Sequence, residues 1–512
     1  MSASTGKAPW TLTAFWTAGL GSAGVLAWLW PRMVAVRGDD FGYLESVVLT
    51  VQSGQPVSSE WLEPFNRVLP ALSALAWWGT GNFYVSTLGV LAAMVAGVFI
   101  LGWLWLRPAL PSGWPGDLAC FAVALCPFCL NKAVEFTGIP LGLLLCLAAL
   151  LAWRGSRPVV FHVLVLVAVL NRQSAVCLLA LPAWSWWSAW RRGDRPDRVA
   201  AGGLVVTAAA IALLVLLLPG NVARSLAAQR LAHREWLTVG AQALLGLVLL
   251  GGLAAFWSLV RGEPPGVARR GADLGLAAGW LLAGAILSAF GVALQCETPL
   301  LARAGMFLVP VAALLAARAP RALLRVPPGM LAAAGLYAAL VAWRGIWWDY
   351  YLLEPALLLV GGRGLPAATP KVMRGRIIAI AALVVMLPGV PPIRYQVRWT
   401  EHAVVTYENL LRGGRVGIRA ASEAPFGFLG WKLFPVACAA PTPMTGLTDF
   451  LGYVEAGRSR LAGEGVLLFD STVPVRSLQP SGELRALPAG YRDRRFPLDN
   501  AEWRDLLGRR TP

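Results

Sequence analysis

Five stretches of the sequence stay apolar for about the length of a bilayer crossing, and this feature limits what the chain can fold into. They are residues 11–30, 83–106, 200–218, 239–260 and 272–294. At 1.5 Å per residue, a helix of about twenty residues spans a hydrocarbon core of roughly 30 Å. The composition agrees, because 57% of the residues are hydrophobic and only 14% are charged. We therefore predict a transmembrane helix at each stretch.

Four shorter apolar runs, at residues 116–130, 138–153, 159–170 and 175–190, are separated by tight turns that carry arginine. Such spacing favours closely packed helical hairpins within the membrane. Together the runs predict an all-α polytopic membrane bundle of about thirteen helices. We expect the first helix to be retained, because residues 11–30 end without the small-residue cleavage site of a signal peptide.

The positions of the cations predict the orientation of the bundle, since short basic loops stay in the cytoplasm. With the N-terminus inside, the inner loops carry Arg107, Arg154, Arg157, Arg191, Arg192, Arg195, Arg198, Arg261, Arg269, Arg270, Arg318, Arg321, Arg325, Arg363, Lys371, Arg374 and Arg376. The net charge of +17 is then mostly charge that anchors the protein beside an anionic inner leaflet. We expect a multi-pass protein of the cell inner (plasma) membrane and no nucleic-acid partner.

The domain organisation predicted from this pattern has two parts. Residues 1–392 form the bundle, including a long first outer loop at 31–81, and residues 393–512 form a tail without a run of spanning length. Short apolar strips at 416–418 and 466–469, bounded by glycine and charged residues, are typical of strands. We predict a small C-terminal α/β domain, extracytoplasmic if the number of helices is odd.

Adjacent carboxylates open the first outer loop, at Asp39 and Asp40. Neighbouring acids beside a membrane repel one another, and such a pair suits a general base or a ligand for a divalent cation. The alternative is an ordinary turn with solvated acids. With three histidines in the chain, any metal site would rely on oxygen ligands, here Asp39 and Asp40. The sequence requires no cofactor and leaves a divalent cation open.

Other acids and several cations map to the same outer side. The acids are Glu60, Glu63, Glu135, Glu235, Glu297, Asp349 and Glu354, and the cations are Lys132, Arg172, Arg303 and Arg344. Carboxylates and guanidinium groups together suit a substrate that carries an anionic phosphate and a nucleophilic hydroxyl. The alternative for Arg303 and Arg344 is snorkelling to the outer headgroups.

Tryptophans cluster at the expected helix ends, which is typical of the aromatic belt at a membrane interface. The clusters are Trp77 and Trp78, Trp103 and Trp105, Trp184 to Trp190, and Trp347 and Trp348. Trp61 differs, since it stands beside Glu60 and Glu63 in the first outer loop, where it could stack on a sugar.

Several local motifs follow one another in the order expected for a known superfamily. Asp39-Asp40-Phe41-Gly42-Tyr43 opens the loop, Glu63-Pro64-Phe65-Asn66 leads into Val68-Leu69-Pro70-Ala71-Leu72, and Gly79-Thr80-Gly81-Asn82-Phe83 precedes the second helix. Glu135 follows in the next outer loop, and Leu170-Asn171-Arg172 forms an arginine-bearing turn. With one helix before the first loop, this plan resembles the polytopic C-type (GT-C) glycosyltransferases, which include protein O-mannosyltransferases and the lipid A aminoarabinose transferase.

The resemblance implies transfer of a sugar from a polyprenyl-phosphate donor to a lipid, glycan or protein acceptor at the extracytoplasmic face. Asp39 or Asp40 would act as the base and Glu135 as a second acid. Lys132, Arg172, Arg303 and Arg344 would hold the phosphate, and Tyr43, Glu63 and Trp61 would contact the substrate. The motifs cover residues 11–190 in detail. No residue matches the lysine that some members carry in the first outer loop.

Two other classes of function remain open: a transporter of lipids or polysaccharides, and a non-catalytic membrane assembly factor. A transporter needs access from both sides, whereas the acids here map to one side. An assembly factor would tolerate the loss of Asp39 and Asp40, which an enzyme would not.

Overall fold

The computed structural model describes residues 43, 46–47, 50–51, 53–57, 66–81, 83–109, 136–195, 197–217, 236–260, 270–292, 294, 299–345, 347–361, 415–419 and 466–470. The chain divides into two compact units. The first consists of Met1–Val25, Val95–Lys132 and Leu141–Gly389, and the second of Leu26–Met94, Ala133–Pro140 and Val390–Pro512. The predicted sites at Asp39, Asp40, Trp61, Glu63, Lys132 and Glu135 lie outside the described residues.

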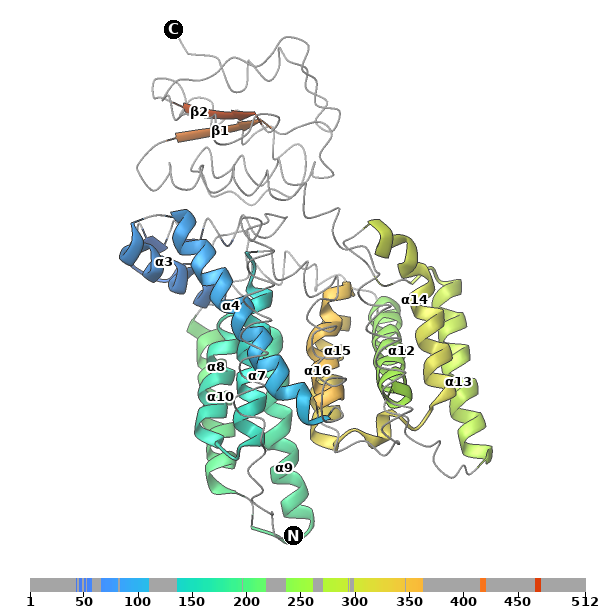
Figure 1. Ribbon diagram of the computed structural model, residues 1–512. Coiled ribbons are helices and arrows are strands. Elements are labelled where there is room, and N and C mark those ends of the chain that lie inside the picture. The colour runs from blue at the N-terminus through green and yellow to red at the C-terminus, as the bar shows by residue number, and fades with distance from the viewer. Residues whose placement is uncertain are drawn as a thin grey trace, which may run out of the picture. The chain divides into compact units, whose positions relative to one another are not determined.

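Helices account for nearly all of the described secondary structure (Figure 1). The α-helices are α3 (Val68–Thr80), α4 (Phe83–Leu106), α7 (Gly138–Arg154), α8 (Pro158–Val169), α9 (Ala180–Arg191), α10 (Arg198–Leu217), α12 (Trp236–Val260), α13 (Arg270–Ala289), α14 (Pro299–Arg318), α15 (Pro328–Arg344) and α16 (Leu353–Gly361). The 3₁₀ segments are η1 (Arg107–Ala109), η2 (Gln173–Leu179), η4 (Leu323–Arg325) and η5 (Asp349–Leu352).

Four of the described helices are long and apolar enough to cross a membrane, over Gly89–Leu106, Arg198–Leu217, Trp236–Leu259 and Gly271–Ala289. They coincide with four of the five long predicted stretches, which confirms a helical, multi-pass membrane protein. The fifth stretch, residues 11–30, lies outside the described residues, as does 116–130. The number of thirteen spans stays a prediction.

Two predicted helices differ from the structure at their ends. α13 ends at Ala289 rather than near residue 294, because Gly291 adopts a left-handed φ of 65° that turns the chain. The run predicted at 175–190 begins as the 3₁₀ segment η2 and becomes α-helical only at Ala180. The periodicity of apolar residues does not separate these two kinds of helix in so short a segment.

Burial separates central helices from helices that face the lipid. Half of the spanning window of α12 is buried, against 11% in α10 and in α13. The exposed surfaces of α10 and α13 are apolar, with Leu216 72% and Leu274 70% exposed. Exposure of such surfaces to water would be unfavourable, whereas lipid chains solvate them well. These two helices therefore present their apolar sides to the hydrocarbon.

Small residues permit close packing of α12 and α13 against α14. A Cβ atom built at Gly252 of α12 would lie 2.6 Å from the Cβ of Ala312 and 2.7 Å from its Cα. A Cβ atom at Gly284 of α13 would lie 2.5 Å from the Cβ of Ala313. Consecutive alanines of α14 thus contact two helices, as is common where lipid supplies no hydrophobic driving force for packing.

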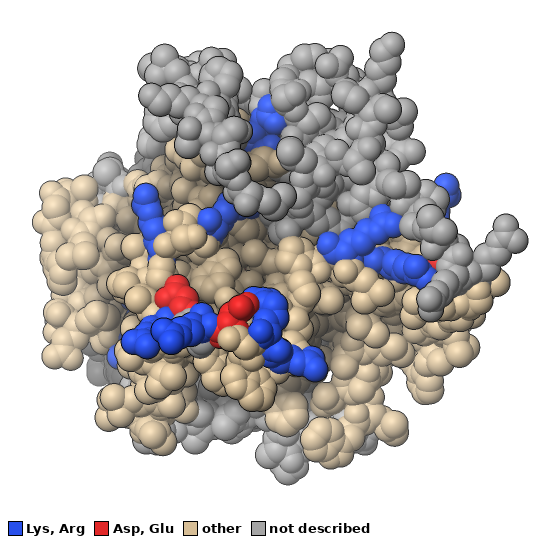
Figure 2. Space-filling view, turned by 90° about the horizontal axis from the view of Figure 1, so that it is seen from below, with Lys and Arg blue, Asp and Glu red and all other residues tan. Residues whose placement is uncertain are grey.

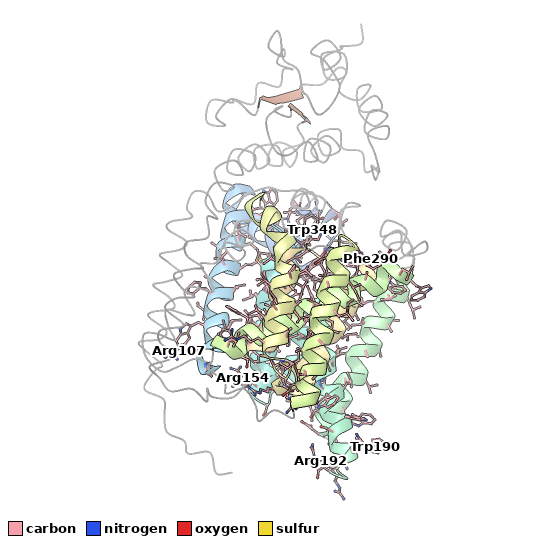
Figure 3. The ribbon with its side chains drawn as sticks, turned by 90° about the vertical axis from the view of Figure 1, so that its right-hand side faces the viewer. Arg107, Arg154, Trp190, Arg192, Phe290 and Trp348 are labelled. Atoms are coloured by element: carbon pink, nitrogen blue, oxygen red, sulfur yellow. The ribbon has the colours of Figure 1, made fainter. Side chains whose placement is uncertain are left out.

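Arginines gather at one end of the helices of the first unit. Arg107, Arg154 and Arg192 lie at that end, and Phe290 and Trp348 lie at the other (Figure 3). The view from below shows more basic than acidic side chains (Figure 2). Asp273 of α13 forms an ion pair with Arg321, with 2.6 Å between Oδ1 and Nε. The arginines predicted for different inner loops therefore share one end, while the side of the membrane they face stays a prediction.

The two strips predicted as strands are strands. β1 (Arg415–Arg419) and β2 (Val466–Asp470) pair in parallel, with Arg415 opposite Val466 and Arg419 opposite Asp470. A parallel pair requires a crossover connection rather than a hairpin. The rest of the tail lies outside the described residues, so the complete α/β domain stays a prediction.

The interfacial interpretation of the tryptophans is wrong for three of them. Trp105 and Trp347 are each 1% exposed, and Trp103 is 5% exposed. The indole N–H of Trp105 donates to the carbonyl of Leu357 at 2.9 Å, and that of Trp347 donates to the carbonyl of Gln242 at 3.0 Å. A position near a helix end suggested a belt, but for Trp105 and Trp347 internal hydrogen bonds allow the ring to be buried.

We expect Gly252→Ala to lower the free energy of unfolding by about 1–3 kcal/mol, because the added methyl group meets backbone atoms of α14 that cannot turn away. Thermal unfolding of the purified protein in detergent measures this. Gly240→Ala is the matched control, since it lies on the same helix with nothing within 4 Å. Equal stability of the two variants would contradict the close packing of α12 and α14.

Candidate functional site

A contact between two distant segments lies in the second unit. The hydroxyl of Tyr43 would be 2.5 Å from a Cβ atom at Gly138, so it packs directly on the glycine backbone. Tyr43 is 7% exposed, and Phe136, two residues before Gly138, is fully buried. Tyr43 follows Asp40 by three residues, and Gly138 follows Glu135 by three. The contact therefore joins the segment after the acidic pair to the segment after Glu135.

The motifs that follow Tyr43 in the sequence also form the expected elements. The run that contains Pro70 begins helix α3 at Val68, and its proline stands in the first turn, where a missing N–H costs little. Gly81 ends this helix in a left-handed conformation, with a φ of 64°, and α4 begins two residues later at Phe83. The predicted helix, glycine turn and spanning helix are thus present in that order.

The second candidate region, in the first unit, depends on a helix that is too short to cross the membrane. α8 begins beside Arg157 at the arginine-rich end and has 12 residues. It is therefore about 18 Å long, well short of the roughly 30 Å of the hydrocarbon. The turn at Asn171 and Arg172 then lies within the membrane. Non-helical backbone at such a depth is tolerated where protein buries it, and Asn171 is fully buried.

Arg172 forms an ion pair inside this turn. Its Nη1 donates to Oε1 of Glu354, in the first turn of α16, at 3.2 Å. The hydroxyl of Ser174 donates to the other carboxylate oxygen, Oε2, at 3.4 Å. The side chains of Arg172 and Glu354 are 13% and 6% exposed. The pair joins residues 182 positions apart and compensates two charges that would be costly alone in hydrocarbon.

Aromatic rings surround the ion pair and bring a second arginine to it. The guanidinium carbon of Arg172 lies 5.5 Å from the centre of the Tyr351 ring and 6.0 Å from that of Tyr350. The guanidinium of Arg344, at the end of α15, lies 5.9 Å from the same Tyr351 ring. Tyr337 of α15 is fully buried beside Glu354. Two of the predicted phosphate-binding residues therefore share one tyrosine.

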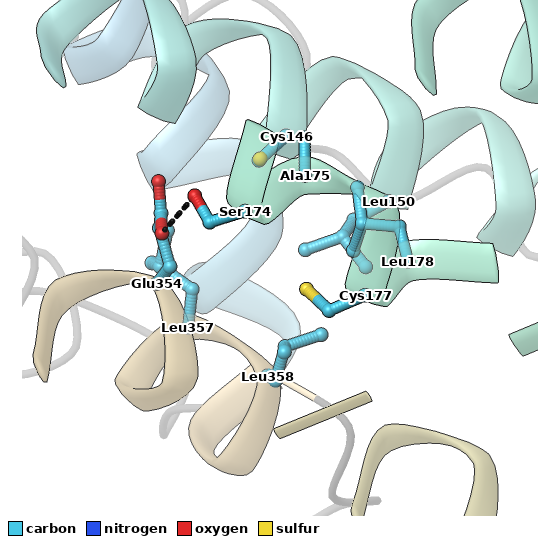
Figure 4. Close-up of a pocket in the computed structure, with 9 residues that line it drawn as sticks. All are labelled: Cys146, Leu150, Ser174, Ala175, Cys177, Leu178, Glu354, Leu357 and Leu358. Carbon is cyan, nitrogen blue, oxygen red and sulfur yellow. Dashed lines mark hydrogen bonds between the residues drawn. The ribbon is translucent and has the colours of Figure 1, made fainter. Parts of the chain in front are cut away.

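A small cavity adjoins the carboxylate. Its volume of about 10 Å³ is close to that needed to hold one water molecule. Glu354 of α16 and Ser174 of η2, which are hydrogen-bonded to one another, line it together with Cys146 and Cys177 (Figure 4). A 3₁₀ segment has three residues per turn, so Ser174 and Cys177 stand one above the other on the same side of η2.

The structure brings together only part of the predicted site. Arg172 and Arg344 meet at Tyr351, whereas Tyr43 lies in the second unit. Arg303 belongs to α14, and the structure does not describe its side chain. Among the described residues no group of three or more His, Cys, Asp or Glu could hold a metal ion. The cation predicted at Asp39 and Asp40 falls on positions that the structure does not describe.

The sequence prediction placed Glu354 at an outer helix end but did not select it for the site. One available signal was its position in an apolar segment, because a charge there normally has a partner. The identity of that partner could not be read from the sequence, since Arg172 and Glu354 are on segments far apart in the chain.

We expect substitutions of Arg172 and Glu354 to have non-additive effects on the free energy of unfolding. Arg172→Met or Glu354→Met alone should cost about 3–5 kcal/mol by leaving one buried charge without its partner, while the double variant should cost much less. The exposed pair of Arg192 and Asp194, 2.8 Å apart, is the matched control and should contribute less than about 1 kcal/mol. Additive effects of the two single substitutions at Arg172 and Glu354 would contradict this coupling.

The resemblance to the GT-C glycosyltransferases rests on the motifs of residues 39–83, Glu135 and the turn at Arg172. Of these motifs, the structure describes Tyr43, the elements from residue 66 onward and the turn. Comparisons of the chain with protein-family models, with curated proteins and with solved structures each found no match.

Proposed function

We propose that the chain is a membrane glycosyltransferase of the GT-C type, with about thirteen helices and a C-terminal extracytoplasmic domain. It takes a sugar from a polyprenyl-phosphate donor and transfers it to a lipid, glycan or protein acceptor at the extracytoplasmic face of the cell inner membrane.

The contact of Tyr43 with Gly138 carries this proposal. A transferase of this kind needs acids from the first outer loop and from the next outer loop in one place. Tyr43, three residues after Asp40, contacts Gly138, three residues after Glu135. A residue larger than glycine at position 138 would separate the two segments.

The arginine cluster supports the same proposal from the first unit. The guanidinium carbons of Arg172 and Arg344 lie 5.5 Å and 5.9 Å from the centre of the Tyr351 ring. Guanidinium groups are well suited to hold a phosphate while negative charge develops on it. Their partly buried surroundings strengthen this interaction relative to water.

The proposed reaction is an inverting displacement. The acceptor hydroxyl attacks the anomeric carbon while the bond from that carbon to the phosphate oxygen breaks. Asp39 or Asp40 takes the hydroxyl proton, with Glu135 as the second acid, and the arginines hold the departing phosphate. A divalent cation at Asp39 and Asp40 would also stabilise the charge of the departing phosphate.

We expect Asp39→Asn, Asp40→Asn or Glu135→Gln to slow sugar transfer, with loss of the base costing at least about a hundredfold. Sugar transfer and donor hydrolysis are measured on protein in nanodiscs with a panel of polyprenyl-phosphate sugars. Glu464→Gln, a carboxylate of the tail, is the control and should retain activity. Wild-type protein that neither binds nor consumes a donor, with variants that behave like it, would overturn the proposal.

We expect Gly138→Ala to lower the rate of transfer by about tenfold to a hundredfold, because the methyl group displaces Tyr43 and with it the acidic segment. Tyr43→Phe in the same chain removes the hydroxyl that the methyl group meets first and should restore part of the rate. Gly89→Ala is the control, with nothing within 4 Å. A double variant as slow as Gly138→Ala would show that the contact does not position the acids.

Transport of a lipid-linked saccharide is the second candidate, and one observation favours it. Two interrupted segments, the turn after α8 and the short pair η5 and α16, meet at a buried ion pair, as the broken helices of transporters meet at their substrates. Movement of an intact lipid-linked sugar across proteoliposomes, without its consumption, would favour this candidate over transfer.

A further inference from the structure

Two turns at the arginine-rich end, from α7 to α8 and from α9 to α10, are fixed by backbone hydrogen bonds. The N–H of Arg157 donates to the carbonyl five residues before it, at 2.9 Å, after Ser156 with a left-handed φ of 53°. The N–H of Asp194 likewise donates to the carbonyl five residues before it, at 3.0 Å, after Gly193 with a φ of 74°. Both turns close in the manner of a Schellman motif, so they carry their side chains on ordered backbone.

The starts of α8 and α10 lie beside one another. His162 of α8 is buried, with its Nε2 3.1 Å from the carbonyl oxygen of Ala200 in the first turn of α10. Its Nδ1 lies 3.1 Å from the hydroxyl of Thr207, two turns further along α10. Arg157, directly before α8, and Arg198, the first residue of α10, therefore stand at adjacent helix starts.

The acids of the second turn already have partners. Asp194 forms an exposed ion pair with Arg192, at 2.8 Å. The carboxylate of Asp197 accepts a hydrogen bond from the N–H of Val199 at 2.9 Å, as the N-cap of α10. These interactions leave other arginines of the two turns available to an anion.

Three of these arginines, Arg157, Arg195 and Arg198, have exposed side chains. None of the three forms an ion pair within the part of the chain that the structure describes. Apolar side chains follow closely, since Val159 of α8 is 63% exposed and Val199 of α10 is 51% exposed. The surface thus changes from cationic to apolar within about one turn of each helix, which suits a ligand with an anionic head and an apolar body.

Helix α9 contributes aromatic rings beside this surface. Trp186, Trp187 and Trp190 are exposed, and the guanidinium carbon of Arg191 lies 4.9 Å from the centre of the Trp187 ring. Trp190 and Arg192 lie together at the arginine-rich end (Figure 3). Indole rings are favoured at the level of lipid headgroups, so this end of α9 lies where headgroups meet hydrocarbon.

We infer that the arginine-rich ends of α8, α9 and α10 form a discrete binding site for an anionic phospholipid. The guanidinium groups of Arg157, Arg195 and Arg198 hold its phosphate, and its acyl chains lie along the exposed valines. Guanidinium geometry matches phosphate, and basic sites between transmembrane helices at the interface are typical of bound anionic lipids. A soluble acidic partner would gain nothing from the exposed valines. This site does not depend on the proposed sugar transfer.

The test adds dioleoyl phosphatidylglycerol or dioleoyl phosphatidylcholine to the full chain in detergent and measures bound lipid by native mass spectrometry. The wild type should retain phosphatidylglycerol at a saturable site and bind phosphatidylcholine much more weakly. Arg157→Gln and Arg198→Gln should each weaken the binding of phosphatidylglycerol about fivefold, and the double variant about twentyfold. Both side chains are exposed, so the variants should fold, and thermal unfolding without added lipid measures this.

Arg318→Gln is the matched control. Arg318 is the last residue of α14, is exposed and forms no ion pair with another described residue, so the variant removes one equivalent charge outside the site. It should bind phosphatidylglycerol as the wild type does.

Equal retention of the two lipids by the wild type would overturn the inference. A loss in Arg318→Gln as large as that in Arg198→Gln would overturn it too, because the attraction would then be spread over all cations of this end. Displacement of the lipid by an equal concentration of glycerol phosphate would show that the surface binds a soluble anion instead of a phospholipid.

Discussion

The ion pair of Arg172 and Glu354 is the interaction on which the arrangement of the first unit depends. Lipid offers no hydrogen bonds, so a polar group at this depth must find its partners within the protein. The turn after α8 carries Arg172, and the first turn of α16 carries Glu354. Each charge would be unfavourable alone in hydrocarbon, and the hydrogen bonds of Arg172 and Ser174 to Glu354 compensate for this. The rings of Tyr350 and Tyr351 lie beside the guanidinium of Arg172, and the guanidinium of Arg344 also approaches the Tyr351 ring.

The transmembrane helices could be predicted from the sequence because their signal is local. The run at 83–106 is apolar throughout, and α4 begins and ends at those residues. The glycine at position 291 already marked a turn, although the apolar pattern alone extended α13 past it. The strips at 416–418 and 466–469 gave equally local signals for β1 and β2.

The site was predictable only in part, because contacts between distant segments are not visible in a local pattern. Arg172 and Arg344 were selected as cations on the outer side, but their common neighbour Tyr351 was not selected. Glu354 could be placed on a side of the membrane and not against a partner. Trp105 was expected at the membrane interface, but its ring is buried. Its indole N–H donates to the carbonyl of Leu357, a partner about 250 residues away that the local sequence does not reveal.

The 3₁₀ segment η2 connects Arg172 to the start of α9 at Ala180. Its seven residues rise about 2.0 Å each, whereas an α-helix rises 1.5 Å per residue. Conversion of η2 to α-helix would shorten it by roughly 3.5 Å and rotate its two ends by about 140° relative to one another. Such a change would draw Arg172 along the membrane normal and turn it away from Glu354. The helical type of η2 is thus coupled to the position of Arg172 and to its ion pair with Glu354.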